Sequence, residues 1–323
     1  MSSNTKKLII LVIGILLLSG FLSMVCGFSS LGFSFLNRST SRGAGKTFQI
    51  RGNYSNIDIE SETGNIRLHD AGKDSARVVW SGSSVMKLSV GTRSGTLKIT
   101  ERYRLPWFLR IGVNPGKSEI DVYLPRQNQK RLEIESDTGN INVSAGFSFT
   151  GAEIETDTGA VDFQADVRGM LKIDTDTGRI TCGSFEPENL EITSDTGAVN
   201  AADIRAAKDI KVKTDTGKIT LTNVKGEDLS VKSDTGSLSL ANAFAADSMK
   251  LETDTGSISL DRCDAGKLEI ESDTGSVTGT LLTEKVFTVK TSTGRVNVPE
   301  SSFGGECKIK TDTGNITIEI TGK

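Results

Sequence analysis

A four-residue unit, Thr/Ser-Asp-Thr-Gly, recurs along the second half of the chain and constrains its fold more than any other feature. Its final glycine occurs ten times from Gly139 to Gly314, at nearly constant intervals, and Ser292 replaces the aspartate in the copy that ends at Gly294. A period of about 20 residues is typical of proteins built from stacked coils. An isolated, degenerate copy ends at Gly64, well upstream of the others. The ten glycines are Gly139, Gly159, Gly178, Gly197, Gly217, Gly236, Gly256, Gly275, Gly294 and Gly314.

Each repeat, numbered from its glycine as zero, predicts two short strands. Positions −7, −5, +2 and +4 are apolar at 39 of 40 sites, with Gly279 as the exception, and the positions between them are mostly polar. Such alternation is the period of a half-buried strand. A return segment of six to eight residues follows, usually with one apolar anchor at +7 or +8. These anchors are Phe147, Val167, Phe185, Ile204, Val224, Phe244, Cys263 and Leu282.

Two arrangements fit this pattern. In a β-solenoid each strand pairs with its counterpart in the next coil, about 4.8 Å away. In a series of hairpins the two strands of one repeat pair across Asp-Thr-Gly. The constant period and the regular return segment favour the solenoid. We therefore expect an all-β, single-stranded parallel β-solenoid (β-helix) of about 19–20 residues per coil, with an N-terminal transmembrane helix.

The composition divides the chain into four parts. Residues 1–28 form a transmembrane anchor or signal segment, in which Lys6-Lys7 precedes an apolar run from Leu8 to Val25. Such a run is just long enough to span a bilayer. Residues 29–46 form a flexible tether, 47–130 irregular β coils that cap the solenoid, and 131–323 the ten regular repeats.

The location of the chain follows from its N-terminal segment. A cleaved signal peptide and a lipoprotein modified at Cys26 are the alternatives to an uncleaved anchor, but the cleavage site is poor for both. All three place the rest of the chain outside the cytoplasmic membrane. Residues 1–130 carry a net charge of +10 and residues 131–323 a net charge of −13, so the two parts suit different neighbours.

One segment of the irregular part is a candidate interaction loop. It concentrates arginine and aromatic residues, which suit both membrane interfaces and binding hot spots. A loop that folds its aromatic side chains over the end of the core is the alternative. The candidate residues are Arg102, Arg104, Trp107, Phe108 and Arg110.

The Asp-Thr-Gly turn has a structural interpretation. We expect the glycine to supply a positive φ, the aspartate to close an Asx-type turn, and the preceding Ser or Thr to bond the backbone at a narrow corner. Aspartic proteases share the triplet but need two copies that face each other, which a row along one axis does not provide.

The aspartates would form a row with one carboxylate per coil. The row is a candidate cation site, although calcium wants six to eight oxygen ligands and one carboxylate per coil supplies too few by itself. Its members are Asp137, Asp157, Asp176, Asp195, Asp215, Asp234, Asp254 and Asp273.

The sequence offers little material for catalysis. Cys182, Cys263 and Cys307 occupy apolar positions of the repeat, so we expect buried thiols rather than disulfides. His69 is the only histidine, which leaves almost nothing for a histidine-based metal site or a Ser-His dyad. We expect no catalytic residue, no cofactor and no nucleic acid partner. A β-helical enzyme that cleaves polysaccharide with carboxylates and arginine is the remaining enzymatic alternative.

The chain resembles the bacterial "putative adhesin" or toast-rack family, which includes the Lia-type membrane-anchored proteins of envelope-stress operons. The resemblance covers residues 47–323 and rests on the strand pair of residues 87–100, on Ile120 to Pro125 and on the serial Asp-Thr-Gly coils. It implies a β-solenoid on the cell envelope without catalysis, and it carries over no binding residues.

We therefore expect a non-catalytic, adhesin-like binding or scaffold module, held to the membrane by its N-terminal helix. Its partner would be an envelope polymer or protein. An envelope-stress sensor or modulator is one alternative, and a self-assembling structural protein is another. The C-terminal coil ends at Lys323 without an evident cap, so self-association through that coil is also expected.

Overall fold

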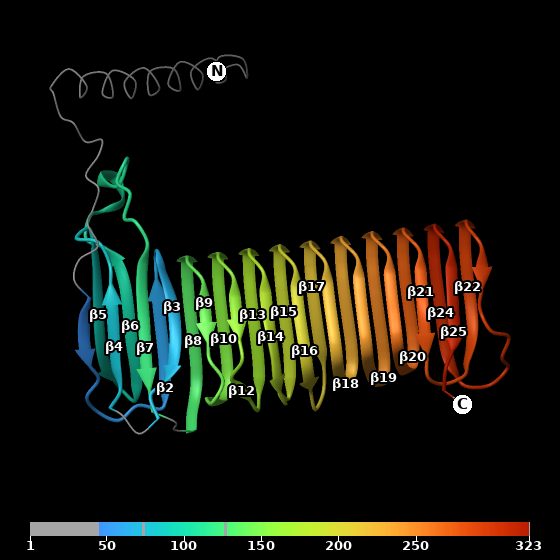
Figure 1. Cartoon of the computed structure of the whole chain (residues 1–323), viewed down its shortest axis with the longest axis horizontal. Coiled ribbons are helices and arrows are strands. Elements are labelled where there is room, and N and C mark those ends of the chain that lie inside the picture. The colour runs from blue at the N-terminus through green and yellow to red at the C-terminus, as the bar shows by residue number, and fades with distance from the viewer. Residues whose placement is uncertain (1–44, 73–74, 126–127, 323) are drawn as a thin grey trace, which may run out of the picture. The chain divides into compact units, whose positions relative to one another are not determined.

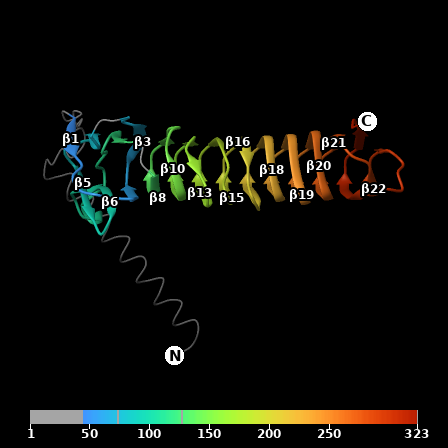
Figure 2. The same cartoon turned by 90° about the horizontal axis from the view of Figure 1, so that it is seen from below.

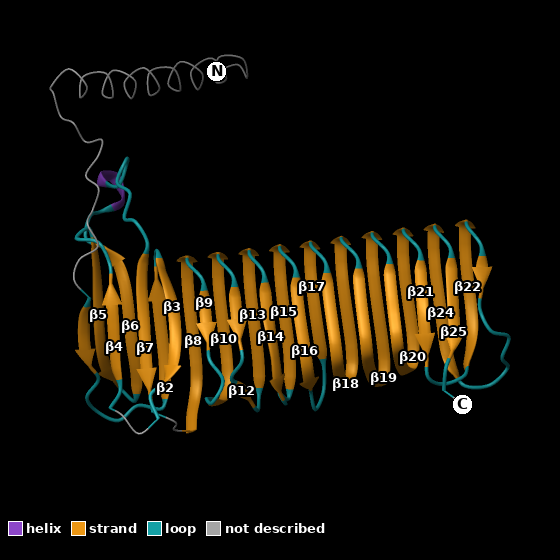
Figure 3. Ribbon diagram, in the orientation of Figure 1, coloured by secondary structure: helices purple, strands orange, loops and turns teal. Residues whose placement is uncertain are grey.

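The computed structural model describes residues 45–72, 75–125 and 128–322, and these hold 25 β-strands and one short 3₁₀ helix (Figure 3). The predicted transmembrane helix lies outside the described residues. All strands belong to one compact unit, hereafter the solenoid, which consists of Arg42–Arg104 and Pro115–Lys323. Leu105–Asn114 fall outside that unit and are described separately.

The strands form three successive groups along the chain (Figure 1). The first group is β1 (Lys46–Gln49), β2 (Asn56–Ser61), β3 (Gly64–Asp70), β4 (Arg77–Ser81), β5 (Met86–Arg93), β6 (Thr96–Tyr103) and β7 (Ser118–Leu124). The second is β8 (Asn128–Thr138), β9 (Ile141–Val143), β10 (Ser148–Thr158), β11 (Val161–Phe163), β12 (Asp166–Val167), β13 (Met170–Thr177), β14 (Ile180–Phe185), β15 (Asn189–Thr196), β16 (Val199–Arg205), β17 (Ile210–Thr216), β18 (Ile219–Thr235), β19 (Leu238–Thr255) and β20 (Ile258–Thr274). The third is β21 (Val277–Leu281), β22 (Lys285–Thr293), β23 (Val296–Asn297), β24 (Gly305–Thr313) and β25 (Ile316–Ile320).

The regular repeats form a parallel β-solenoid, as the sequence predicts. Ile134 pairs with Ile154, and Ile154 pairs with Ile173, so each step along the sheet is one repeat of the sequence. The strands on the two sides of a turn pair with different neighbours: β8 with β10, and β9 with β11. The hairpin alternative is therefore wrong. Figure 2 shows the coils side by side along the axis of the solenoid.

The core is one continuous column of aliphatic side chains. The predicted inward positions are buried from Leu132 onward through the middle coils, where most side chains are 0–4% exposed. Each Å² of apolar surface that these side chains remove from water stabilises the fold by about 25 cal/mol. This burial is the main stabilisation that such a narrow fold can gain. Two predicted anchors of the return segment are wrong by one residue. Ala243 and Leu281 are buried in place of Phe244 and Leu282.

Close stacking, rather than a positive φ, explains most glycines of the Asp-Thr-Gly turns. Only Gly139, Gly275 and Gly314 have a φ in the positive range, at 151–158°. A Cβ added to any of the ten would overlap the carbonyl oxygen of the glycine in the adjacent coil. The prediction that glycine is needed for a positive φ is therefore wrong for the other seven. At those positions glycine is needed because the two backbones approach each other too closely for a side chain.

The Ser or Thr before each Asp lies inside the corner, as predicted. Ser233 Oγ donates to the Gly217 carbonyl at 3.0 Å, and Thr253 Oγ1 donates to the Gly236 carbonyl at 3.0 Å. Each bond joins one coil to the next. The predicted bond is not made in the first four regular coils, where the hydroxyls of Ser136, Thr156, Thr175 and Ser194 are buried without a hydrogen-bond partner among the described residues. The predicted Asx-type bond is not found: in the described coils from Asp157 to Asp273, the aspartates of the Asp-Thr-Gly turns accept no hydrogen bond from a backbone N–H. Instead Lys213 lies 2.8 Å from Asp215.

The coils at the N-terminal end do not stack in chain order. The coil of β2 and β3 lies between the coil of β6 and β7 and the first regular coil, because β2 pairs with both β6 and β8. Likewise β3 pairs with both β7 and β9. Antiparallel strands then close the end: β5 pairs with β6, β4 with β7, and β1 with β4.

A buried carboxylate ties this N-terminal end together. Glu101 is 0% exposed and takes the place in its coil that Ser or Thr holds in the regular coils, opposite Ser61. It accepts hydrogen bonds from Trp80 Nε1 at 2.6 Å, from Ser61 Oγ at 2.9 Å and from Ser118 Oγ. A buried carboxylate requires such donors, so this cluster fixes β2, β4 and β7 against β6.

At the C-terminal end, too, the coils do not stack in chain order. The prediction that the C-terminal coil has an open edge is therefore wrong. β24 pairs with both β20 and β22, and β25 pairs with both β21 and β23. The last coil of the chain is therefore enclosed, and the coil of Gly294 is outermost. The predicted self-association through the C-terminal coil rests on the wrong coil, because both edges of that coil are already paired.

One buried ion pair spans the inserted coil. Lys285 on β22 is 3% exposed, and its Nζ lies 2.6 Å from Asp264 Oδ1 and 2.7 Å from the Ala265 carbonyl on β20. The lysine passes over Gly305 on β24, where a Cβ would lie 3.4 Å from Nζ. The pair therefore links the outermost coil to β20 across the coil between them. Buried pairs of this kind are costly to break from one side.

The three described cysteines should be unreactive while the protein is folded. Burial raises the pKa of Cys182 to about 12, of Cys263 to about 11 and of Cys307 to about 12. The thiolate is the reactive form, so all three thiols stay protonated at pH 8. In a Cys26→Ser background, mass spectrometry should find no alkylation by iodoacetamide before urea is added and three alkylated sites afterwards. Rapid alkylation of any of the three in the native protein would contradict this packing.

Candidate functional site

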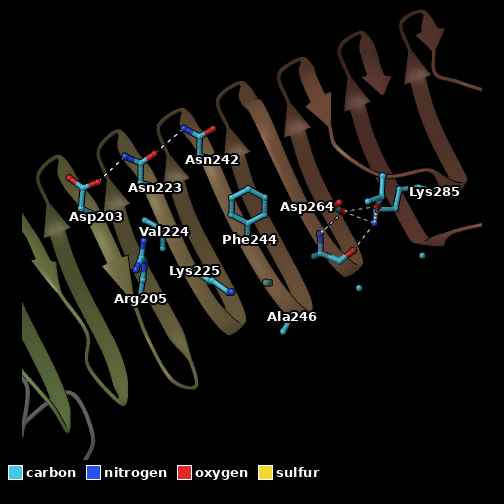
Figure 4. Close-up of a pocket in the computed structure, with 15 residues that line it drawn as sticks. Asp203, Arg205, Asn223, Val224, Lys225, Asn242, Phe244, Ala246, Asp264 and Lys285 are labelled. Carbon is cyan, nitrogen blue, oxygen red and sulfur yellow. Dashed lines mark hydrogen bonds and ion pairs between the residues drawn. The ribbon is translucent and has the colours of Figure 1, made fainter. Parts of the chain in front are cut away.

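A concave surface lies on the return segments of the solenoid, between Asp203 and Gly305. Hereafter it is called the groove, and its volume is about 920 Å³. Side chains from successive coils line it, as Figure 4 shows. The lining includes Asp203, Arg205, Asn223, Lys225, Asn242 and Phe244. A smaller hollow of about 380 Å³ shares Asp203, Arg205 and Asn223 and extends the surface toward Asp166.

A row of left-handed residues at position +6 shapes one side of the groove. Asp203, Asn223 and Asn242 have φ of 55°, 55° and 51°. Asn and Asp tolerate this conformation better than other residues with a Cβ. Their side chains form a ladder: Asn223 Nδ2 donates to Asp203 Oδ1 at 2.8 Å, and Asn242 Nδ2 donates to Asn223 Oδ1 at 2.9 Å (Figure 4). The ladder holds polar groups at one per coil along the groove.

The left-handed turn also sets which residue of the return segment faces outward. Position +7 is buried, as at Val224 and Ala243, while position +8 carries Arg205, Lys225 and Phe244. Lys225 pairs in the ladder of strands with Arg205 on one side and with Phe244 on the other. Two cations and one aromatic ring therefore lie in adjacent coils on one line.

Some charged side chains of the groove have a close partner, and others do not. Asp264 is paired with the buried Lys285, and Asp203 accepts the amide hydrogen bond of the ladder. Arg205 reaches only Glu186, at 3.8 Å and with both side chains more than 70% exposed. Lys225 makes no ion pair within the described residues. The two cations at Arg205 and Lys225 are therefore available to an anionic ligand.

Sequence reasoning did not identify the groove. Its signal was the recurrence of Asp or Asn at +6 in three successive repeats, next to a +8 residue that is charged or aromatic. The signal was missed because Phe244 was assigned to the core, as the apolar anchor of its return segment.

The residues of the candidate interaction loop are divided between two environments. Arg102 Nη2 lies 2.6 Å from Glu60 Oε2, and Arg104 Nε donates to the Met86 carbonyl at 2.8 Å, so both are bonded within the solenoid. Trp107 and Phe108 belong to η1 (Trp107–Leu109) and are 78% and 56% exposed.

The segment of Leu105–Asn114 is held by its own short-range contacts. Arg110 Nε donates to the Leu105 carbonyl at 3.0 Å, and the rings of Trp107 and Phe108 meet edge to face at 6.0 Å. Leu109 and Ile111 are also exposed, at 55% and 76%. This segment therefore presents four large apolar side chains to solvent. The alternative of a loop that buries its aromatic side chains in the core does not fit these exposures.

The row of aspartates lies at the corner, one carboxylate per coil, and most of its members are exposed. Where the chain is described, no group of three or more His, Cys, Asp or Glu side chains is arranged to hold a metal ion. Cation binding by the row stays a prediction.

The only histidine of the chain is not part of the groove. His69 lies at the other end of the solenoid, where Nε2 is 2.8 Å from Asp121 Oδ1 and the ring stacks on Tyr123 at 4.7 Å. Glu60 has a lowered pKa because Lys98 and Arg102 donate to it.

Within the described ranges, no helix is both long and apolar enough to cross a membrane.

Comparison with solved structures finds distant relatives. A putative lipid binding protein from Parabacteroides distasonis is 15% identical, with 86% of this chain and 97% of that chain covered and a TM-score of 0.44. Putative adhesins from Bacteroides fragilis and P. distasonis are each 12% identical, with 85% and 96% covered and TM-scores of 0.40 and 0.41. No curated protein sequence matches the chain.

Residues 54–319 match the family described as Toastrack DUF4097. The match begins two residues before β2 and ends within β25, and thus includes every Asp-Thr-Gly coil. The resemblance noted in the sequence is confirmed, and the chain belongs to the Toastrack DUF4097 family.

Proposed function

We propose that this protein is a non-catalytic binding module of the cell envelope, and that its groove holds an extended anionic polysaccharide. The observation that carries the proposal is the line of Arg205, Lys225 and Phe244 beside the polar ladder. The family resemblance and the expected N-terminal anchor support an extracytoplasmic site, tethered to the membrane by residues 1–28.

The side chains of the groove suit a sugar polymer. An aromatic ring gives an apolar surface for the C–H face of a sugar ring, while amide and carboxylate groups bond hydroxyls. Arg205 and Lys225 would pair with acidic substituents. The groove volume of about 920 Å³ is within the range of ligand sites. Successive coils repeat these groups at about 4.8 Å, which matches a ligand that is itself a repeating chain.

A peptide ligand fits the groove less well. Extended peptides commonly bind by adding a strand to a free sheet edge. The strands under the groove are paired on both sides, as β16 is with β14 and β18, and β18 is with β19. Recognition must therefore use side chains alone, and the net charge available from Arg205 and Lys225 selects an anionic polymer.

Truncation of the groove residues should weaken binding of polygalacturonate to a fragment that begins at residue 45. Phe244→Ala and Lys225→Ala should each raise the Kd by about tenfold, a typical effect for a central contact. Isothermal titration calorimetry would measure it, with neutral dextran as the uncharged polymer. Binding by wild type should weaken as salt rises.

The matched control for these variants is Lys211→Ala. Lys211 is an exposed lysine in the same region of the solenoid but pairs with Glu191 at 3.0 Å outside the groove. Its loss should leave the Kd unchanged. Equal weakening by Lys211→Ala, or tighter binding of polyglutamate than of polygalacturonate, would sink the proposal.

The exposed segment around η1 provides a second test, which concerns the proposed location at the cell envelope. Trp107→Ser with Phe108→Ser should reduce cosedimentation of the fragment with vesicles that contain anionic lipid, since exposed aromatic and basic residues favour the interface. The free energy of unfolding should change by less than about 0.5 kcal/mol, as for other exposed sites. Met170→Ser, at a side chain 39% exposed in the regular coils, is the control. A large loss of stability would show that the two rings are packed in the core.

A further inference from the structure

The outermost coil at the C-terminal end has one unpaired edge. β22 pairs with β24, and β23 pairs with β25, and neither strand has a second partner among the described strands. Inner strands have two: β24, for example, has β20 and β22. The backbone of the nine-residue strand β22 therefore presents free N–H and C=O groups along one side, which is a template for another strand.

The core is also open at this end. Val296 on the outermost coil is 48% exposed, and Phe303 in the following loop is 67% exposed. The inward side chains Phe287 and Val289 are only partly buried. Their counterparts in the middle coils are 0–1% exposed, so apolar surface remains to be covered here.

The N-terminal end shows how this fold closes such a surface. β5 lies antiparallel on β6, and β4 lies antiparallel on β7. As a result the inward Met86 and Leu88 of β5 are 0% and 6% exposed. No antiparallel strand lies on β22 or β23 in the described part of the chain. The missing layer at the C-terminal end would therefore be supplied by antiparallel strands from another molecule.

We propose that a second copy of this chain supplies that layer, through a two-fold interface in which β22 pairs antiparallel with β22 of the second copy. The sequence of β22 is self-complementary about Thr288. In that register Phe287 lies opposite Val289 of the second copy, both inward, and Val286 lies opposite Lys290, both outward. Lysine thus meets an aliphatic side chain rather than another lysine.

The charges on this edge favour a copy in this register over other arrangements. Lys290 pairs in the ladder of strands with Lys310, whose partner is Glu271 on the far side, so Lys290 itself makes no ion pair within the described residues. A head-to-tail contact with β5 would add Lys87 and Arg93 to an edge that already carries Lys290. The two-fold register avoids that accumulation of positive charge.

Cysteine crosslinking of the full chain in detergent tests the register. In a Cys26→Ser background, Thr288→Cys places two thiols opposite each other at the two-fold axis and should give a disulfide-linked dimer on mild oxidation. Lys290→Cys, on the same strand, faces residue 286 of the second copy and should crosslink poorly. Thr220→Cys, on an outward position in the middle of the solenoid, should remain monomeric.

Charge variants test the same interface without a crosslink. Val286→Lys places two lysines opposite each other at two symmetric positions and should raise the dimer Kd by about tenfold or more. Adding Lys290→Glu to it should restore the affinity, because each lysine then faces a carboxylate. Analytical ultracentrifugation of the full chain in density-matched detergent would measure both.

The outcomes separate this interface from others. A monomeric wild-type chain at about 100 μM would overturn the proposal, because a paired edge of this size should associate well below that concentration. A dimer that Val286→Lys leaves intact would also overturn it, since association would then use another surface. Efficient crosslinking through Lys290→Cys but not Thr288→Cys would exclude the two-fold register.

Discussion

The contact between backbones at the Asp-Thr-Gly corner is the constraint on which the rest of this structure depends. Each of the ten regular coils passes its glycine so close to the glycine carbonyl of the adjacent coil that no Cβ fits between them. This contact fixes the height of the stack at that corner. From the coil of Gly217 onward the inward Ser or Thr also donates to that carbonyl, as at Ser233 and Thr253, and the apolar positions on both sides fall into columns. The constant period of the sequence is the length of chain needed to return to that corner.

Function is expected where this constraint is relaxed. The return segments vary in length and conformation, and there the left-handed residues Asp203, Asn223 and Asn242 build the ladder beside the groove. The two ends depart from chain order as well, and Glu101 and the pair of Lys285 with Asp264 hold those departures in place. The regular coils thus serve as a rigid support, while the groove, the η1 segment and the outermost coil carry the proposed contacts.

The sequence predicted the local geometry well and the order of coils poorly. Alternation on either side of Gly217, for example, identifies Val212 and Ile219 as core residues because each side of a strand has one environment. The sequence does not predict the order in which the coils stack, because any coil with the same pattern of apolar positions fits at the same place in the stack. The pattern of apolar positions is the same in the coils of Gly294 and Gly314, although the first is outermost and the second enclosed. The groove was missed because a one-residue shift moves Phe244 from the inside to the outside.

The most direct measurement is the unfolding free energy of two glycine variants in urea. Gly236→Ala adds a methyl group where the adjacent carbonyl leaves no space, and overpacking of this kind costs about 1–3 kcal/mol or more. Gly151→Ala, in another regular coil, would place its Cβ 3.6 Å from the Met170 carbonyl, which is an ordinary contact. We predict a clear loss of stability for Gly236→Ala and a change of less than about 0.5 kcal/mol for Gly151→Ala. Similar stabilities for the two variants would contradict the account of the corner.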